Sequence, residues 1–174
     1  MSKLTPPVSA VDHAQGAENA GVTLVEYGDY ECPHCAEAHP VVQEIQRRVS
    51  DLRFVFRNFP LSEMHPYAEG AAEAAEAGGS QGRFWEMHNI LIENSSALDG
   101  RHLIGYARKI GLELSQFESE LKERTHEGRV KTDFMSGVRS GVNGTPSFFI
   151  NGVRHNGDAD LESLLEAIQK SVSR

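Results

Sequence analysis

The fold of this chain is decided by residues 22–35, which read VTLVEYGDYECPHC. The first part of this stretch is mostly β-branched or aromatic and is bracketed by glycines, which predicts a buried strand over 22–27. Glu26 interrupts the apolar run, so its carboxylate either lies at an exposed edge of the strand or is buried for a purpose. Cys32 and Cys35 come directly after the strand, at the expected start of a helix.

The residues after this stretch predict a helix and a second strand. Pro33 suits a first helical position, and apolar residues then recur at steps of three and four to about residue 50. Pro40 falls inside this helix and should kink it. Apolar residues alternate with arginines over 52–59, as in a strand. A strand, a helix and a strand with short connections form a βαβ unit, which implies parallel pairing.

Residues 62–141 change to helical periods and predict an inserted helical subdomain. The run of alanine and glutamate over 68–77 is a strong helix former, and we expect its glutamates on a solvated face. Ser115 with Glu118 fits a capping box for a later helix. This part of the chain shows no internal repeat.

The last part of the chain returns to strands. Asn151-Gly152 between two strand-like runs is a strong hairpin signal, and a helix capped by Asp158 or Asp160 follows. The predicted architecture is therefore an α/β domain, β-α-β and then β-β-α, built from residues 1–61 and 142–174 and interrupted by the helical insert.

The composition narrows the class of protein. The chain has 174 residues, 39% of them hydrophobic, which predicts a soluble globular domain. No apolar run approaches the roughly 20 residues of a membrane-spanning helix. The net charge of −8 argues against nucleic acid as the main partner. Residues 1–20 lack the apolar segment of a secretory signal, which predicts a cytoplasmic protein unless the native N-terminus is missing.

The spacing of the only two cysteines predicts redox chemistry. Residues i and i+3 on a first helical turn bring two sulfurs within disulfide reach. Cys32 would sit at the helix end, where free N–H groups favour a thiolate, and its neighbours suggest that it is exposed. Cys35 lies on the apolar face of the helix, placed to resolve a mixed disulfide.

Three other interpretations of the cysteines stay open at this point. They are a structural disulfide, two inert buried thiols, and a zinc site completed by His34 or His39. Zinc usually takes four ligands and often a second cysteine pair, which this chain lacks. The remaining histidines, among them His65, His88 and His102, show no ligand spacing and are interpreted as structural.

The chain resembles the DsbA-like branch of the thioredoxin superfamily. The residues that carry the resemblance are Glu26, the motif Cys32-Pro33-His34-Cys35, Pro40, and Thr145-Pro146 before a strand. The helical insert lies where that branch has its helical domain, and the segments 59–66 and 81–85 are also similar to bacterial relatives. The resemblance implies a thioredoxin fold with an inserted helical subdomain.

The resemblance also implies roles for individual residues. Glu26 would shuttle a proton to or from Cys35. Pro146 would be the cis-proline beside the cysteines, and Thr145 would offer backbone hydrogen bonds to an extended substrate segment. His34 would stabilise the Cys32 thiolate. The plain alternatives are a surface glutamate, an ordinary loop proline and a solvated histidine.

The implied activity is thiol–disulfide exchange with protein or peptide thiols, as an oxidase, reductase or isomerase. The cysteine pair is itself the redox group, so we expect no metal and no organic cofactor. We expect a monomer recycled by glutathione, a thioredoxin-type protein or a DsbB-like partner. Two alternatives are a glutathione-dependent transferase or isomerase of the kappa type and a non-catalytic peptide-binding or chaperone module. In a reducing cytoplasm the pair would rest as a dithiol and act as a reductase.

Overall fold

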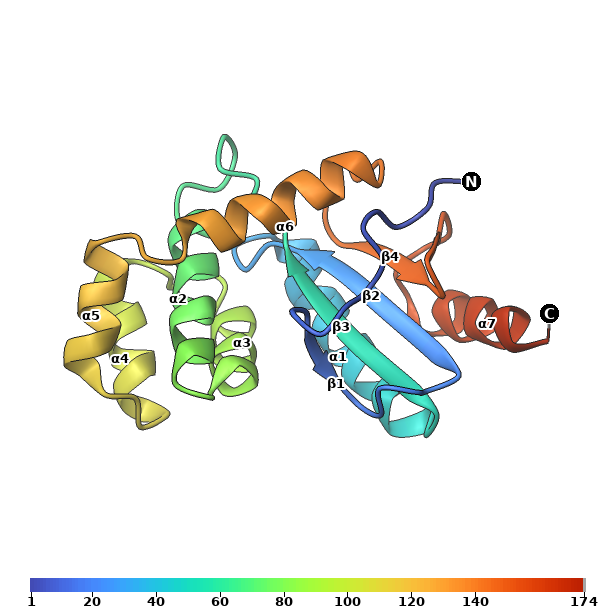
Figure 1. Cartoon of the computed structure of the whole chain (residues 1–174), viewed down its shortest axis with the longest axis horizontal. Coiled ribbons are helices and arrows are strands. Elements are labelled where there is room, and N and C mark those ends of the chain that lie inside the picture. Colours follow the sequence, from blue (N-terminus) through green and yellow to red (C-terminus); the bar gives the residue numbers. More distant parts are fainter. Residues whose placement is uncertain (174) are drawn as a thin grey trace.

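The computed structural model describes residues 1–173 and contains a five-stranded mixed sheet (Figure 1). The strands are β1 (His13–Gln15), β2 (Val22–Gly28), β3 (Leu52–Asn58), β4 (Ser147–Ile150) and β5 (Val153–Arg154), and their spatial order is β1-β3-β2-β4-β5. β2 and β3 pair in parallel, and all other pairs are antiparallel. The predicted βαβ unit is therefore present.

Seven helices surround and extend this sheet within the described residues. They are α1 (Pro33–Arg48), α2 (Ala68–Ser80), α3 (Phe84–Glu93), α4 (Gly100–Lys109), α5 (Leu114–Lys122), α6 (Glu127–Arg139) and α7 (Leu161–Val172). Helices α2 to α5 form a separate group at one end of the molecule, and α6 runs from that group back across the sheet (Figure 1). All five helices from α2 to α6 fall within the predicted insert, while its boundaries at 62 and 141 stay a prediction.

Apolar side chains fill both faces of the sheet. Alternate residues of a strand point to opposite sides, and β2 is buried on both, with Leu24 and Val25 each 0% exposed. One apolar cluster lies toward α1, α7 and the helical group, and a second includes Tyr27 and Phe149. Because β2 runs between β3 and β4, its carboxyl end is held in the middle of the sheet.

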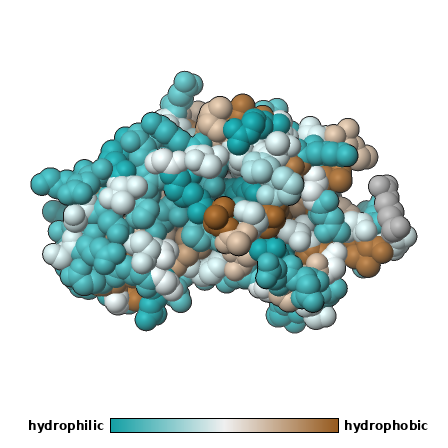
Figure 2. All heavy atoms as spheres, viewed as in Figure 1, coloured by the Kyte–Doolittle hydropathy of each residue, from teal (hydrophilic) through white to brown (hydrophobic). Residues whose placement is uncertain are grey.

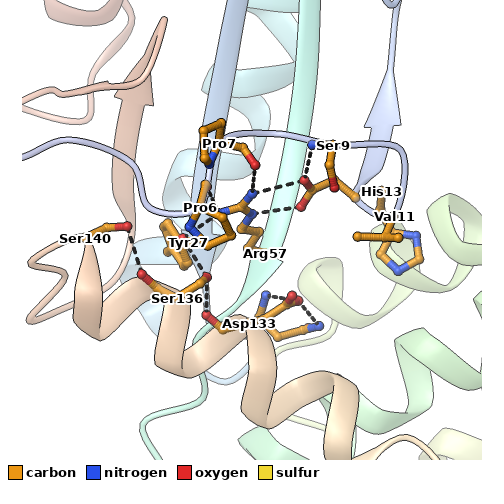
Figure 3. A network of polar contacts seen from close by, with 12 residues as sticks. Pro6, Pro7, Ser9, Val11, His13, Tyr27, Arg57, Asp133, Ser136 and Ser140 are labelled. Carbon is orange, nitrogen blue, oxygen red and sulfur yellow. Dashed lines mark hydrogen bonds and ion pairs between the residues drawn. The ribbon is translucent and has the colours of Figure 1, made fainter.

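The segment before β2 is fastened across the sheet by a buried arginine. The side chain of Arg57, on β3, is 3% exposed, and its guanidinium lies 2.8 Å from a carboxylate oxygen of Asp12. It also donates to the carbonyls of Pro6 and Pro7 and to the Tyr27 hydroxyl (Figure 3). A buried guanidinium needs such a full set of acceptors. The alternation over 52–59 gave no sign that this arginine is buried, nor that a short strand β1 pairs with β3.

Two predicted features of the helical part are wrong. Helix α5 is capped by Glu113, whose carboxylate accepts from the N–H groups of Ser115 and Gln116, so Ser115 does not begin a capping box. The glutamates of α2 do not form a solvated face, because Glu73 and Glu76 are 4% and 5% exposed. Each is buried beside a positively chargeable partner, Arg124 for Glu73 and His13 for Glu76.

The predicted hairpin and final helix are present. Asn151 and Gly152 join β4 to β5 with φ angles of 48° and 80°, the left-handed values that Asn-Gly turns adopt readily. Asp160, rather than Asp158, caps α7 by accepting from the N–H of Ser163.

The surface of the molecule is mixed. On the face drawn in Figure 2 the end formed by α4 and α5 is mostly hydrophilic, while hydrophobic residues gather in separate patches nearer the middle and toward α7. Within residues 1–173, none of the helices combines the length and the apolar character needed to cross a bilayer.

Candidate active site

The two cysteines lie where the central strand β2 gives way to helix α1. Cys32 is the N-cap residue of α1, with extended backbone, and Pro33 occupies the first turn. Cys35 lies one turn into the helix and is 1% exposed. Both are free thiols, so the structure shows the reduced pair. Proline at the helix start fits because its missing N–H has no helical partner there.

The surroundings of Cys32 favour its thiolate. The pKa of Cys32 is lowered to about 5, chiefly by a hydrogen bond from the Cys35 thiol, while burial acts in the opposite direction. Further donors are the Thr145 side chain and the backbone N–H groups of Cys35 and His34. The Thr145 hydroxyl is buried and is paired with no hydrogen-bond partner among residues 1–173, so a Cys32 thiolate can serve as its acceptor.

Cys35 has the opposite character. Burial, its hydrogen bond to Cys32 and the nearby negative charges of Glu26 and Cys32 raise the pKa of the Cys35 thiol well above its ordinary value. The backbone N–H of Asp29 donates to its sulfur at 3.5 Å. The pair therefore combines one thiol that ionises easily with one that holds its proton.

Glu26 is buried in the centre of the sheet. Its neighbours across the strands are Phe56 on β3 and Phe148 on β4, so β2 has no exposed edge at this point. Glu26 is 5% exposed, and burial together with the negative charge of Cys32 raises its pKa to about 8. Of the two interpretations that the sequence left open, the structure has the buried carboxylate.

The Thr145-Pro146 segment lies against the first cysteine. The Thr145–Pro146 peptide bond is cis, and the Cys32 thiol donates to the Thr145 carbonyl at 3.6 Å. The pairing of Tyr27 with Ser147 in adjacent strands brings the segment there. The sequence suggested that Cys32 is exposed, but its exposed fraction is only 4%. The contact with Thr145 accounts for part of this burial.

The ring of His34 is directed away from the cysteines. Its side chain is 76% exposed, and Nδ1 lies 3.5 Å from the Glu37 carboxylate on the next turn. What His34 supplies to Cys32 in this structure is its backbone N–H. Among the predicted site residues, Cys32, Cys35, Glu26 and Thr145-Pro146 come together, whereas the imidazole of His34 does not join them.

The sequence interpretation missed a polar contact between the active-site loop and the segment before α2. The Asp29 side chain is fully buried, and its carboxylate accepts hydrogen bonds from the N–H groups of Glu31 and Leu61 and from His65 Nδ1. Glu31 in turn accepts from the N–H of Tyr67. His65 is separated from Asp29 by 36 positions, so no spacing rule could pair them.

Histidines also lie behind the active-site loop. The Tyr30 hydroxyl bonds His88 Nδ1 at 2.9 Å, and the His39 and His88 rings are 5.8 Å apart. Burial lowers the pKa of His88 to about 3, so this ring is neutral. Within residues 1–173, no three histidine, cysteine, aspartate or glutamate side chains gather as ligands for one metal ion.

This geometry defines the class of protein. The sheet, with its parallel β2–β3 pair, places three groups together: the Cys32 thiol with a lowered pKa, the buried Cys35 thiol and the buried Glu26 carboxyl. Such a set can accept or pass on a disulfide in two steps, one sulfur being attacked and the other leaving or resolving. These features are those of a thioredoxin-fold protein with a Cys-X-X-Cys pair.

The chain belongs to the thioredoxin family, because the model of that family, described as "Thioredoxin", matches residues 9–170. The fold is also that of solved structures. It aligns with BdbD from Bacillus subtilis at a TM-score of 0.85 and 24% identity, covering 94% of each chain. It aligns with a thioredoxin-like oxidoreductase from Silicibacter pomeroyi at a TM-score of 0.84 and 26% identity, covering 94% of this chain and 93% of the other.

A further similar structure is a thiol-disulfide exchange protein, alpha-DsbA2, from Wolbachia pipientis, with a TM-score of 0.81 and 20% identity over 92% of this chain and 87% of the other. Together these findings confirm that the chain belongs to the thioredoxin family and that it has the predicted fold, an α/β thioredoxin fold with a helical insertion.

The curated proteins with similar sequences are longer than this chain. One is a Na(+)/H(+) antiporter NhaA 1 of Salinispora arenicola, 45% identical over 93% of this chain and 25% of the relative. Another is a Na(+)/H(+) antiporter NhaA 1 of Mycolicibacterium vanbaalenii, 37% identical over 96% of this chain and 28% of the relative. The chain therefore spans about a quarter of the length of these relatives.

Proposed function

We propose that this chain is a DsbA-like thiol–disulfide oxidoreductase that exchanges disulfides with protein or peptide thiols through Cys32 and Cys35. The observation that carries the proposal is the difference between the two thiols. The pKa of Cys32 is lowered to about 5 and that of Cys35 is raised above its ordinary value, although the two share one helical turn. If the two thiols were inert core residues, burial would raise the pKa of both.

In the oxidising direction the reaction has two steps. A client thiolate attacks Cys32 Sγ of the Cys32–Cys35 disulfide, the bond between the two cysteines breaks, and Cys35 leaves as a thiolate that takes up a proton. A second client thiolate then attacks the client sulfur of the mixed disulfide, and Cys32 leaves as a thiolate. The client loses two electrons and forms a disulfide, and the enzyme is left as the dithiol.

Glu26 fits the proton transfer that the first step needs. Its pKa of about 8 leaves it mostly protonated at neutral pH, and its charge acts on both cysteines. A buried acid of this kind can donate to the departing Cys35 thiolate and take the proton back in the reverse reaction. We assign this role to Glu26 on its burial and its proximity to the pair.

Thr145 and Pro146 offer a place for the client backbone. The segment flanks Cys32, and the carbonyl oxygen of Thr145 contacts the Cys32 sulfur. An extended client segment paired with this backbone would present its own sulfur to Cys32, as in strand addition.

The low pKa of Cys32 sets the thermodynamic preference. A stabilised thiolate stabilises the dithiol form, which makes the disulfide comparatively oxidising. We propose that no metal or organic cofactor takes part, because the cysteine pair is itself the redox group. The compartment and the recycling partner decide in which direction the enzyme runs, and a reducing compartment would favour reduction of clients.

The test is oxidative refolding of a reduced, denatured protein that has several native disulfides, with glutathione buffers as the redox source, and in parallel the reduction of insulin by dithiothreitol. The proposal predicts catalysis by the wild type, none by Cys32→Ser, and trapped mixed disulfides with Cys35→Ser. Absence of catalysis in both assays would exclude the proposal.

The same variants separate the two alternative functions. Glutathione conjugation that survives Cys35→Ser would indicate the transferase. Full protection of an unfolded client by the Cys32→Ser/Cys35→Ser double variant would indicate the chaperone.

A further inference from the structure

A buried aspartate whose backbone contacts both cysteines has no place in the reaction steps above. The Asp29 side chain is 0% exposed. Its backbone carbonyl accepts from the N–H of Cys32 at 3.1 Å, and its own N–H donates to Cys35 Sγ at 3.5 Å. The residue is therefore bound to both members of the cysteine pair.

A negative charge in that place opposes the chemistry of Cys32. Two like charges in a site of low dielectric disfavour each other, so an uncompensated Asp29 carboxylate would raise the pKa of Cys32. Three hydrogen bonds reach the Asp29 carboxylate, from the N–H groups of Glu31 and Leu61 and from His65 Nδ1. A positive charge beside Asp29 would offset such an effect on Cys32.

His65 is in position to supply that charge. Its Nδ1 lies 2.8 Å from the Asp29 carboxylate, and its side chain is 16% exposed, so the ring reaches from the buried acid to the surface. The segment that carries it is fixed, since the N–H of Leu61 bonds Asp29 and the N–H of Tyr67 bonds Glu31. The imidazole is therefore held at the active-site loop from two sides.

We propose that His65, protonated and held by Asp29, is a positioning residue that stabilises the Cys32 thiolate by neutralising the buried Asp29 charge, and so makes the cysteine pair a stronger oxidant. This inference rests on the proposed exchange function and adds a residue to it.

The electrostatics of the site agree with this geometry. Burial acts against the charged form of His65, but the hydrogen bond and charge of Asp29 outweigh it and raise the pKa of His65 above 6.5. The negative charges of Cys32 and Glu31 add to this rise. The coupling is reciprocal: if the thiolate favours protonated His65, protonated His65 favours the thiolate.

The test separates charge from hydrogen bonding. His65→Gln keeps a donor that can reach Asp29 but loses the positive charge. We expect it to raise the pKa of Cys32 by about 0.5–1, read from the alkylation rate against pH, and to shift the equilibrium with glutathione toward the disulfide by about three- to tenfold. Adding Asp29→Asn removes the unbalanced negative charge, so the double variant should return the pKa of Cys32 close to the wild-type value.

A matched control is available in the helical part. His102 Nδ1 lies 2.7 Å from the Asp99 carboxylate at the start of α4, which is the same kind of pair in an exposed place. His102→Gln should leave both the pKa of Cys32 and the glutathione equilibrium unchanged. If His65→Gln behaves like this control, or if the double variant is no closer to the wild type than His65→Gln, the inference is overturned.

A second measurement needs no variant and covers the case in which His65→Gln does not fold. The pKa of His65, followed by NMR in the wild-type protein, should be higher in the reduced form, which holds the thiolate, than in the oxidised form. Equal values would overturn the inference. Failure of the proposed function itself is a different result, because it would appear as a wild-type protein that catalyses no exchange in either assay.

Discussion

The sulfur of Cys32 lies 3.6 Å from the carbonyl oxygen of Thr145, a residue 113 positions further along the chain. The contact exists because β4 pairs antiparallel with β2 and so begins where β2 ends. One residue thus offers the sulfur a carbonyl acceptor while it is a thiol and a hydroxyl donor once it is a thiolate. Because Thr145 can contact Cys32 both as a thiol and as a thiolate, this segment influences the pKa of Cys32.

The two cysteines should differ sharply in reactivity toward an alkylating reagent. In the reduced protein we expect the modification of Cys32 to rise with a midpoint near pH 5, and Cys35 to stay unmodified until well above pH 9, because burial and negative neighbours hold its proton. Peptide mapping of the alkylated protein measures both. Rapid modification at Cys35 at neutral pH would contradict the assignment.

Replacements of Cys35 should show which contact lowers the pKa of Cys32 most. The hydrogen bond from the Cys35 side chain is the largest single cause, so Cys35→Ala, which has no donor, should raise the pKa of Cys32. Cys35→Ser keeps a hydroxyl donor and should preserve more of the effect. If Cys32 titrates in both variants as it does in the wild type, the helix start and Thr145, rather than Cys35, determine the pKa of Cys32.

Glu26 should make the stability of the reduced protein depend on pH. Its pKa in the folded state is about 8 against an ordinary 4.5, so the folded protein holds this proton more tightly than the unfolded chain. Stability is therefore lost as pH rises from about 4.5 to 8. Glu26→Gln removes this loss and should be more stable at pH 7 by on the order of 3 kcal/mol, measured by urea unfolding.

The same variant should change the kinetics of exchange. Glu26→Gln cannot accept or donate a proton as a carboxylate does. In the reducing direction, attack of the Cys32 thiolate on a client disulfide should therefore stay near the wild-type rate, while resolution by Cys35, which must first lose its proton, should slow. Stopped-flow measurement of mixed-disulfide formation and decay separates the two. Glu166→Gln on the exposed face of α7 is the control and should affect neither stability nor rate.

The periodic parts of the fold could be predicted from the sequence, and so could the place of the cysteine pair. The run before Cys32 has a strand period and the run after it a helical one, and the two meet at the site. Burial of Glu26 could not be decided in that way, because it depends on strands β3 and β4 lying on both sides of β2. Only the assembled sheet shows that β2 has no free edge.

Long-range polar contacts were the other part that pattern analysis could not reach. His65 has no periodic or spacing relation to Asp29, and their contact depends on where the segment after β3 folds back. Arg57 looked like a solvent-facing residue of an alternating strand, yet Asp12 and two backbone carbonyls bury it. In both cases one charged side chain is explained by a partner distant in the sequence.

Removing only one partner of the buried ion pair between Arg57 and Asp12 should strongly lower the free energy of unfolding. Asp12→Ala leaves a guanidinium that is 3% exposed without its carboxylate, for which we expect a loss of about 3–5 kcal/mol in the free energy of unfolding. The double variant Asp12→Ala/Arg57→Met should lose less than Asp12→Ala alone. Chemical denaturation measures each variant.

An exposed pair provides the comparison for this cycle. Lys170 and Glu166 on α7 are 70% and 63% exposed, and solvent screening should leave their coupling too weak to measure. A coupling between Asp12 and Arg57 as small as this would show that the N-terminal segment is held on the sheet by its backbone contacts and not by the ion pair.

Two glycines of α6 should respond in opposite ways to the same substitution. At Gly137 an added Cβ would lie 2.6 Å from a ring carbon of Phe59 and 3.1 Å from one of Tyr27, whereas at Gly128 nothing lies within 4 Å. Alanine raises helix propensity at both positions by about 0.5–1 kcal/mol. We expect Gly128→Ala to stabilise by about that amount, and Gly137→Ala to destabilise by about 1–3 kcal/mol through overpacking.

The substitution at Gly137 should also reach the active site, because Phe59 is where the strand β3 leads into the segment that carries His65. The N–H of Phe59 bonds the carbonyl of Gly28 at 2.8 Å, directly before Asp29. A ring displaced by Gly137→Ala pushes on this junction, so we expect slower alkylation of Cys32 at pH 6 in Gly137→Ala and the wild-type rate in Gly128→Ala. Equal alkylation rates with a destabilised Gly137→Ala would show that α6 and the active-site loop are mechanically independent.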